Sequence, residues 1–412
     1  MRIRRTVLAG LALAAITVGT AAPAIAQTAQ TARTSPAAHA GTSAAARQAL
    51  PPVNPDALSR AIAGLPDAEG TAAQVRVGGS GGSWQGVSGV RDLRSKRPVP
   101  ANARFRAGSV TKAFTAAVVL QLVAEGKLDL DQTVQHYLPG LLPDGYRPVT
   151  VGQLLNHTSG LPPADRSKGL PAEETADGFT WIYKRRFEHW TPERIVALAV
   201  QDDMEFEPGT AQHYLDINYT VAGMLIEKVT GSSYERQVRD RILRPLGLRD
   251  TSLPTDDPSI HGPHTHGYQV LDGKTIDVTV WGHSMEWAAG NLVSTTADLD
   301  RFTRALFRGD VVPAPQLEQM FTVPPKEVRM YGDAKKDAIY SMGLTRLELP
   351  GVGVLWGKTG GRYGYLTGIG GLRNPAGTGE SPRTVVYSYN SVDAKSESVK
   401  PRTLKIIMAA FS

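Results

Sequence analysis

The spacing of apolar and polar residues changes along the chain from one structural period to another. Residues 55–64 follow a helical pattern, and two short apolar runs on either side of a Gly/Ser turn predict a hairpin. Residues from about 130 to 285 are helical and rich in loops, whereas four apolar runs beyond residue 340 predict strands joined by tight turns. The hairpin strands are Gln74–Val77 and Trp84–Val87, and the later strands are Met342–Leu347, Gly353–Thr359, Leu366–Leu372 and Thr384–Asn390.

Strands at both ends of the chain, with helices between them, predict an α+β fold. Both termini are expected to complete one antiparallel sheet, which is flanked by helices and carries an inserted all-α domain of about 130–285. A final helix is predicted at roughly 401–411.

One predicted helix, from about Val110 to Glu125, is apolar on nearly all sides. Phe114, Val118 and Leu122 share one face, and other apolar residues widen it. A helix with this pattern is buried rather than half exposed. We therefore expect it to be the central helix of the domain, ending at Gly126.

Residues 1–26 have the pattern of a cleaved export signal. Three arginines among the first five residues precede an apolar run, and Ala24-Ile25-Ala26 supplies a small-x-small cleavage site. The paired arginines also permit a twin-arginine route, although a Sec signal is the simpler interpretation. Residues 27–50 are rich in Ala, Thr and Ser and are expected to form a flexible leader, so the folded domain should span 51–412.

Charge and composition argue against several other functions. The formal charge is +6 over 412 residues, and loss of the three signal arginines would leave +3, which is weak support for nucleic-acid binding. The chain has no cysteine, and therefore no disulfide, thiolate chemistry or cysteine-based metal site. No apolar run after the signal is long enough to span a bilayer, so we expect a secreted, extracellular protein without a stable membrane anchor.

Three short motifs in a fixed order indicate serine hydrolase chemistry. Ser109-Val110-Thr111-Lys112 is the only S-x-x-K sequence in the chain, and it opens the apolar helix. Tyr214-Leu215-Asp216 follows a Pro-Gly turn, and Gly357-Lys358-Thr359-Gly360-Gly361 lies in a predicted strand. Each motif alone is weak evidence for this chemistry. The main alternative for the last motif, a phosphate-binding loop, would need glycine at position 352, where the chain has Val352. In this order they are the parts of a penicillin-recognising serine enzyme.

The residue types in these motifs suggest how the chemistry would proceed. Residues three apart on a helix share a face, which places Lys112 beside Ser109. A serine becomes an effective nucleophile when a neighbour removes its proton, and both Lys112 and Tyr214 are candidates for that role. A second ammonium at Lys358 would lower the proton affinity of Lys112 and favour a tyrosinate at Tyr214.

Substrate binding is expected along the strand that carries the third motif. Lys358 and Thr359 would bind a substrate carboxylate, and the backbone N–H groups of Ser109 and Gly361 are the expected oxyanion donors. His157 is interpreted as a structural hydrogen-bonding residue at the end of a helix rather than a catalytic base.

Six longer stretches between residues 104 and 372 resemble the serine β-lactamase-like family, which joins class C β-lactamases and secreted D-alanyl-D-alanine carboxypeptidases. They are collinear and read FRAGSVTKAFTAAVVLQLVAEGKLDLDQTV, LLNHTSGLP, FEPGTAQHYLDINYTVAGMLIEKVTGSSY, PLGLRDTSLP, GNLVSTTADLDRF and WGKTGGRYGY. The resemblance implies the β-lactamase/transpeptidase fold and an acyl-enzyme reaction on a small peptide, a β-lactam or another amide or ester. It implies no metal and no cofactor, and we expect a monomer with no nucleic-acid partner.

Within the family the carboxypeptidases are the nearest match, because Gly343–Gly361 also resembles their sequence. In them an arginine just before the last motif's strand helps to hold the terminal carboxylate, and Arg346 is the nearest match here. We therefore expect a penicillin-binding D-alanyl-D-alanine carboxypeptidase acting on cell-wall peptides. The alternatives are a β-lactamase, an esterase or a D-amino-acid amidase of the same fold, and a catalytically weak protein that binds peptides or β-lactams.

One position departs from the family pattern, because Asp216 occupies the place where the second motif usually has asparagine. An amide both donates and accepts hydrogen bonds, whereas a carboxylate only accepts them. We expect Asp216 to pair with the ammonium of Lys112. Either the substrate differs, for example by carrying a free amine for Asp216 to bind, or the activity is reduced.

Overall fold

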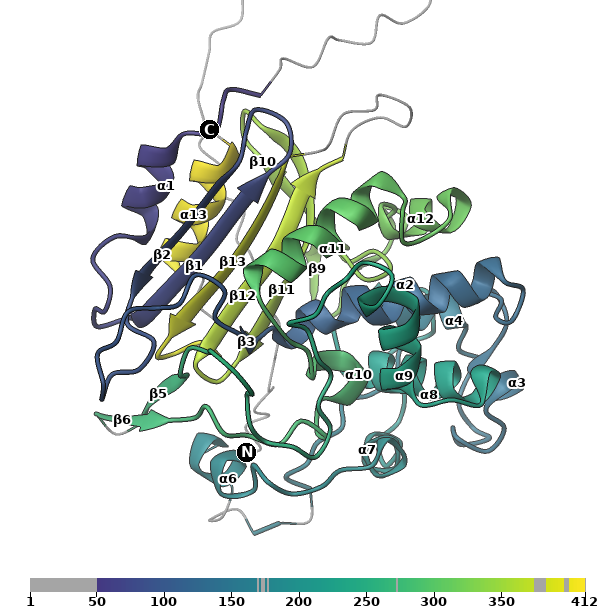
Figure 1. Cartoon of the computed structure of the whole chain (residues 1–412). Coiled ribbons are helices and arrows are strands. Elements are labelled where there is room, and N and C mark those ends of the chain that lie inside the picture. The colour runs from purple at the N-terminus through teal and green to yellow at the C-terminus, as the bar shows by residue number, and fades with distance from the viewer. Residues whose placement is uncertain are drawn as a thin grey trace, which may run out of the picture.

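A six-stranded antiparallel sheet forms one half of the molecule in the computed structural model, which describes residues 50–168, 170–171, 175, 178–271, 273–373, 383–395 and 400–411 (Figure 1). The predicted export signal and all but the last residue of the predicted leader lie outside these residues. The strand order is β10–β11–β12–β13–β1–β2. The strands are β1 (Gly70–Gly78), β2 (Trp84–Gly89), β10 (Thr345–Leu349), β11 (Gly353–Arg362), β12 (Tyr365–Leu372) and β13 (Thr384–Ser391).

Both ends of the chain complete this sheet, as predicted. β1 pairs with β2 on one side and with β13 on the other, so Val75 lies opposite both Gly86 and Tyr387. The helices α1 (Pro55–Ile62) and α13 (Pro401–Phe411) lie side by side over one face of the sheet (Figure 1). Their apolar residues share a core with that face, which fixes the two termini against each other.

The helix α2 (Thr111–Ala124) runs through the centre of the other half of the molecule. Every residue from Thr111 to Leu122 is buried except Gln121, as the all-round apolar pattern predicted. Phe114 stacks on Phe302 with ring centres 3.7 Å apart. Because α2 is enclosed by other elements, the residues at its start are held in a fixed position.

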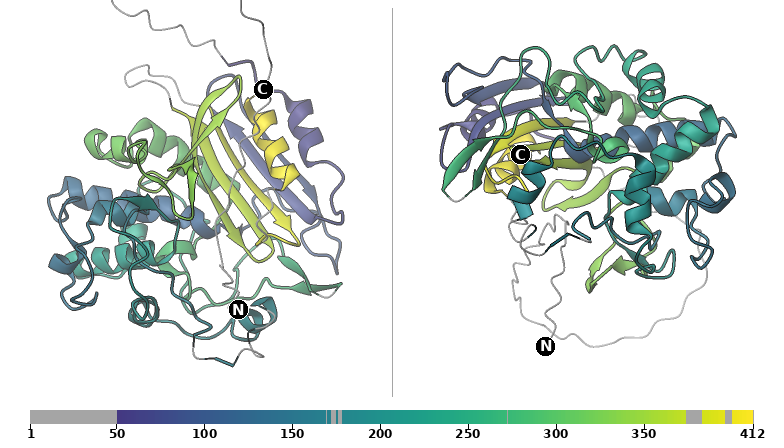
Figure 2. Two further views of the ribbon diagram at one scale, coloured as in Figure 1. Left: turned by 180° about the vertical axis from the view of Figure 1, so that it is seen from behind. Right: turned by 90° about the horizontal axis from the view of Figure 1, so that it is seen from below.

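Most of the remaining helices surround α2 or cover the second face of the sheet, whereas α6 (Gly178–Lys184) lies away from both (Figures 1 and 2). α11 (Thr296–Arg308) packs on β1, β12 and β13, and its first turn is capped by the Thr295 side chain. α8 (Ile217–Thr230) contacts α2, α4, α7 and α10. The others are α3 (Val134–Tyr137), α4 (Val151–Leu155), α7 (Pro192–Ala199), α9 (Tyr234–Val238), the π-helical turn η2 (Arg239–Leu243), α10 (Trp287–Gly290) and α12 (Ala314–Met320).

Three small sheets complete the fold and were not predicted. One pairs β3 with β7, one has the order β4–β8–β9, and one pairs β5 with β6. Their strands are β3 (Phe105–Arg106), β4 (Ala211–Gln212), β5 (Tyr268–Leu271), β6 (Lys274–Asp277), β7 (Val293–Ser294), β8 (Arg329–Met330) and β9 (Asp333–Asp337). Among the described residues, no helix has the length and apolar character needed to cross a membrane.

One strand of the main sheet begins later than predicted. β10 starts at Thr345 rather than near Met342, because Gly343 adopts a positive φ of 93° within a turn. The turn is closed by a 3.0 Å hydrogen bond from the Ser341 N–H to the Leu344 carbonyl. A Cβ at Gly343 would lie 2.6 Å from Ala116 on α2, so this glycine also allows the turn to approach the central helix.

Candidate active site

One edge of β11 is left without a neighbouring strand where the third motif lies. β10 pairs with residues 353–357 only, so in the described part of the chain residues 358–362 have no strand on that side. The turn before α2 packs against them instead. A Cβ at Gly360 would overlap the carbonyl oxygen of Ala107 and lie 2.9 Å from the Ser109 nitrogen, so the approach requires glycine.

Ser109 lies in a single turn of 3₁₀-helix, η1 (Gly108–Val110), directly before α2. Lys112 follows on the first turn of α2, and its Nζ donates to Ser109 Oγ at 3.2 Å and to the Ala289 carbonyl oxygen at 3.0 Å. The Lys112 side chain has no solvent-accessible surface. The two polar residues of the first motif are therefore in contact, as their spacing predicted.

Tyr214 and Lys358 bring the second and third motifs to the same point. Tyr214 lies shortly before α8, which begins at Ile217, and Lys358 lies on β11 with 5% of its surface exposed. The Nζ atoms of Lys358 and Lys112 lie 4.5 Å and 5.0 Å from the centre of the Tyr214 ring. All four predicted catalytic residues, Ser109 included, thus share one small volume.

Burial controls the ionisation of the phenol and of the second lysine. It raises the pKa of Tyr214 well above the ordinary value, the Asp216 carboxylate adds to this effect, and Ser109 opposes it. It lowers the pKa of Lys358 well below the ordinary value, the positive charge of Lys112 adds to this effect, and Asp216 opposes it. The phenol form of Tyr214 is therefore favoured in the free protein, rather than the tyrosinate that Lys358 was expected to favour, because burial and Asp216 outweigh the Ser109 hydrogen bond.

Asp216 is the N-cap residue of α8, and it forms the predicted ion pair. Its Oδ1 accepts a hydrogen bond from Lys112 Nζ at 2.6 Å, and 56% of its side chain remains exposed. Partial burial alone would raise the pKa of Asp216, but the Lys112 ammonium outweighs it and holds that pKa below its ordinary range. Asp216 is thus a carboxylate that is anchored to the buried lysine and still accessible to a ligand.

The segment that carries Tyr214 is held by His157, which has a positive φ of 63°. Its carbonyl oxygen accepts the His213 N–H at 2.9 Å, and its Nδ1 lies 3.2 Å from the Asn218 amide nitrogen and 3.4 Å from the Leu215 nitrogen. The ring packs on Tyr214 with centres 4.4 Å apart. Burial and the two nearby lysines lower the pKa of His157 well below its ordinary value, which keeps the ring neutral and able to accept hydrogen bonds.

The other three predicted substrate-binding residues, Gly361, Thr359 and Arg346, lie on the neighbouring strands β11 and β10. Gly361 adjoins the nucleophile turn, since a Cβ at Gly108 would lie 3.0 Å from the Gly361 nitrogen. Thr359 is half-buried, and its carbonyl oxygen accepts from Lys358 Nζ at 3.2 Å. Arg346 lies on β10 opposite Trp356, and its guanidinium lies 3.5 Å from the Glu348 carboxylate.

Three charged residues near the site were not predicted. Arg362 directly follows Gly361 and forms a buried ion pair with Glu286. Lys395 lies in the turn after β13, and its Cδ is 3.9 Å from the point where a Cβ on Gly361 would stand. Arg362 could have been noticed because it adjoins the third motif, but Lys395 is in none of the motifs.

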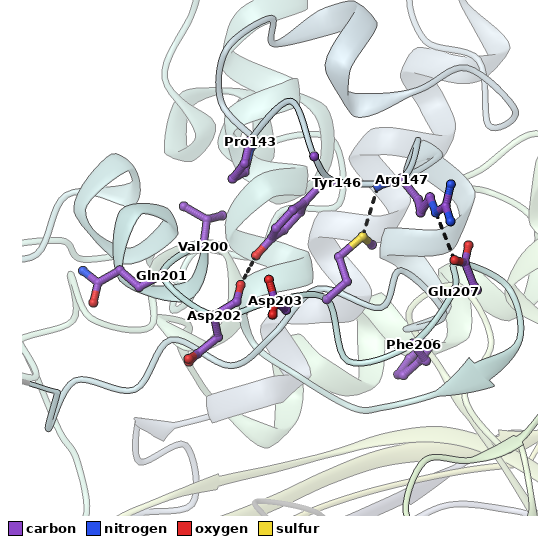
Figure 3. A pocket seen from close by; sticks show the side chains of 11 residues that line it. Pro143, Tyr146, Arg147, Val200, Gln201, Asp202, Asp203, Phe206 and Glu207 are labelled. Atoms are coloured by element: carbon purple, nitrogen blue, oxygen red, sulfur yellow. Dashed lines mark hydrogen bonds and ion pairs between the residues drawn. The ribbon is translucent and has the colours of Figure 1, made fainter.

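A separate cavity of about 480 Å³ lies outside this cluster (Figure 3). It is lined by residues 143, 145–147, 200–204, 206 and 207, and none of the predicted site residues belongs to it. Two of its contacts are a 3.0 Å hydrogen bond from Arg147 to Glu207 and a bond from the Tyr146 hydroxyl to the Asp202 carbonyl. The cavity is therefore not the place where the three motifs meet.

Comparison with known proteins agrees with the arrangement of these motifs. A family model described as Beta-lactamase matches residues 58–405. The chain is 27% identical over 295 residues to penicillin-binding protein 4* of Bacillus subtilis (strain 168), and this alignment covers 68% of this chain and 60% of that protein. It is 31% identical over 233 residues to penicillin-binding protein 4 of Amycolatopsis lactamdurans, and this alignment covers 55% of this chain and 57% of that protein. The chain thus spans less than two-thirds of the length of these relatives.

Two solved structures match over nearly their whole length. A D-stereospecific amidohydrolase from Streptomyces sp. is 31% identical with a TM-score of 0.73, over 87% of this chain and 98% of that one. A D-amino acid amidase from Ochrobactrum anthropi SV3, solved in complex with D-phenylalanine, is 25% identical with a TM-score of 0.67, over 86% and 98%. These likenesses identify the fold as the α+β β-lactamase/transpeptidase fold.

Proposed function

Because the chain belongs to the Beta-lactamase family of serine hydrolases, we propose that it hydrolyses an amide bond next to a D-amino acid through an acyl-Ser109 intermediate. The observation that supports this most directly is the position of Lys112 Nζ, which lies 3.2 Å from Ser109 Oγ and 2.6 Å from Asp216. Nucleophile, proton acceptor and an accessible carboxylate are thereby joined in one hydrogen-bonded unit.

In the proposed reaction, the substrate ammonium takes the place of Lys112 as the partner of the Asp216 carboxylate, and Lys112 gives up its own proton to solvent. The resulting amine accepts the proton of Ser109 Oγ as that oxygen attacks the substrate carbonyl carbon. The negative charge that develops on the carbonyl oxygen is stabilised by the N–H groups of Ser109 and Gly361. The charge of Asp216 still favours the ammonium that Lys112 becomes. Tyr214, held as a phenol, donates its proton to the leaving nitrogen and is reprotonated by Lys112. A water molecule then hydrolyses the acyl-enzyme by the reverse proton path.

The preference for a D-amino-acyl substrate with a free amine rests on Asp216 and on the structural relatives. A substrate ammonium is a suitable partner for an accessible carboxylate, whereas a side-chain carbonyl is not. The two structural relatives described above are a D-stereospecific amidohydrolase and a D-amino acid amidase, and each is covered almost completely by this chain. The preference therefore moves from the carboxypeptidase expected first to an amidase.

A D-alanyl-D-alanine carboxypeptidase is the second candidate. The curated relatives named above are penicillin-binding proteins. The unpaired edge of β11 is also suited to an extended peptide, which could add to the sheet there.

Stereochemically matched substrates test the proposal. The purified protein would be given D-phenylalaninamide, L-phenylalaninamide, N-acetyl-D-phenylalaninamide and an N-acetylated peptide ending in D-Ala-D-Ala, with a Ser109→Ala variant as control. We expect hydrolysis of D-phenylalaninamide, little of the L-enantiomer or the acetylated amide, and none by the variant. Turnover of the D-Ala-D-Ala peptide alone would support the second candidate, and turnover unaffected by Ser109→Ala would contradict both.

A further inference from the structure

Lys395 is an unpaired lysine beside the proposed oxyanion donor. Its side chain passes alongside Gly361, with Cδ 3.9 Å from the point where a Cβ on that glycine would lie. Within the described residues, Lys395 makes no hydrogen bond or ion pair, and it is exposed. A lysine ammonium that lacks an internal partner is free to bind a ligand anion.

The turn that presents Lys395 is fixed on both sides. The Val392 N–H donates to the Glu69 carbonyl at 3.1 Å, and the Val392 carbonyl accepts the Val270 N–H at 3.0 Å. Asp393 forms a 3.0 Å ion pair with Lys400, and Ala394 is buried in the core between the sheet, α1 and α13. The backbone that leads into Lys395 is therefore anchored through Val392, Asp393 and Ala394.

The charged groups around Lys395 leave its ammonium available to bind an anion. The two carboxylates that interact with it, Asp216 and Glu286, each have another cation as partner, namely Lys112 and Arg362. Arg166 also interacts with Lys395 and makes no ion pair within the described residues. Burial lowers the pKa of both Lys358 and Lys395, but Lys358, the cation expected to hold a carboxylate, is only 5% exposed, whereas Lys395 is exposed. Lys395 is thus the more available cation at this edge of β11.

We propose that Lys395 binds the carboxylate of the leaving residue and favours substrates with a free carboxyl group directly after the scissile amide. The inference rests on the proposed function, because it places the scissile carbonyl at the N–H of Gly361. In an aminoacyl-amino acid the terminal carboxylate lies one residue from that carbonyl, and Lys395 lies beside the same glycine. The preferred substrates are therefore D-aminoacyl peptides with a free carboxyl end rather than simple amides.

A pair of ligands that differ only in this carboxylate tests the proposal. D-phenylalanyl-D-alanine and D-phenylalanyl-D-alaninamide would be titrated by calorimetry into protein carrying Ser109→Ala, so that binding is measured without turnover. With Lys395 present the dipeptide should bind more tightly than the amide. Lys395→Gln should weaken dipeptide binding by about tenfold and leave amide binding nearly unchanged, since one charge-assisted hydrogen bond is lost.

Two further variants separate charge recognition from structural damage. Lys395→Arg should retain the preference for the dipeptide, and Lys405→Gln, at an exposed position of α13, should change neither affinity. Equal losses for both ligands in Lys395→Gln, an unchanged ratio, or no binding of the dipeptide would overturn the proposal. Hydrolysis of the D-amides by protein with Ser109 is scored separately, so failure of the proposed function can be told apart from failure of this inference.

Discussion

Replacing Asp216 by asparagine exchanges the one charged acceptor in the second motif for a neutral group of the same shape. Asp216 is bonded to Lys112 at 2.6 Å and is 56% exposed, so the substitution alters both the lysine and the surface that a ligand meets. The amide would regain the ability to donate a hydrogen bond to a substrate carbonyl, and it would lose the charge that attracts a substrate ammonium.

The expected magnitude follows from the contribution of one hydrogen bond to a charged group, roughly 1.5–3 kcal/mol. Solvent exposure of Asp216 reduces this figure, so we expect a value near its lower end. A change of about 1.4 kcal/mol is tenfold in kcat/KM. The ratio of kcat/KM for D-phenylalaninamide to that for N-acetyl-D-phenylalaninamide should therefore fall by about tenfold in Asp216→Asn.

The ratio is the useful quantity, because any effect of the substitution on Lys112 acts on both substrates. Steady-state rates would be measured for both substrates near pH 7, with Asp144→Asn, an exposed aspartate outside the site, as the matched control. A ratio that stays constant while both rates change would show that Asp216 acts through Lys112 only. The argument that Asp216 recognises a free amine would then be refuted.

Three other sets of substitutions test separate parts of the account. Single replacements of Lys112, Tyr214 and Lys358 should each lower kcat by several orders of magnitude, and double replacements should add little; additive losses in a double-mutant cycle would contradict shared proton transfer. Lys358→Met should abolish activity yet raise the melting temperature by a few degrees near neutral pH, because the folded protein holds the pKa of Lys358 below its ordinary 10.5. The destabilisation caused by Lys358 is complete below its folded pKa and shrinks as the pH rises towards 10.5. The melting temperatures of the unsubstituted protein and of Lys358→Met should therefore converge as the pH rises; a difference that widens with pH would be inconsistent with this cause. Gly360→Ala should destabilise the fold by about 1–3 kcal/mol and reduce acylation, because its Cβ would overlap the Ala107 carbonyl; unchanged denaturation and rates would show that the turn can move.

Much of the main sheet could be predicted from the sequence because its strands have local signatures. Apolar runs separated by turn residues identified β11, β12 and β13, and the all-apolar run after Ser109 identified the buried α2. The three small sheets contain strands as short as two residues, such as β3, whose pairing depends on tertiary packing rather than on local pattern. α11 also escaped prediction, although its cap at Thr295 and its amphipathic pattern are local features.

The contacts predicted at the site are present where they depend on spacing and charge, whereas properties that depend on the three-dimensional surroundings were not predicted. The contact between Ser109 and Lys112 follows from helical geometry, and the pairing of Asp216 with Lys112 follows from charge. The ionisation of Tyr214 could not be predicted, since it depends on how completely the fold excludes water. Lys395 reaches Gly361 through a turn after β13, and nothing local in the sequence indicates that approach.

The identity of the acylated residue tests the central claim most directly. Protein turning over D-phenylalanine methyl ester, and protein mixed with benzylpenicillin, would be quenched in acid at short times and analysed by intact mass and peptide mapping. We predict a single acyl adduct on the peptide that contains Ser109, and none in Ser109→Ala. An adduct on another residue, or full turnover by the Ser109→Ala variant, would contradict the account.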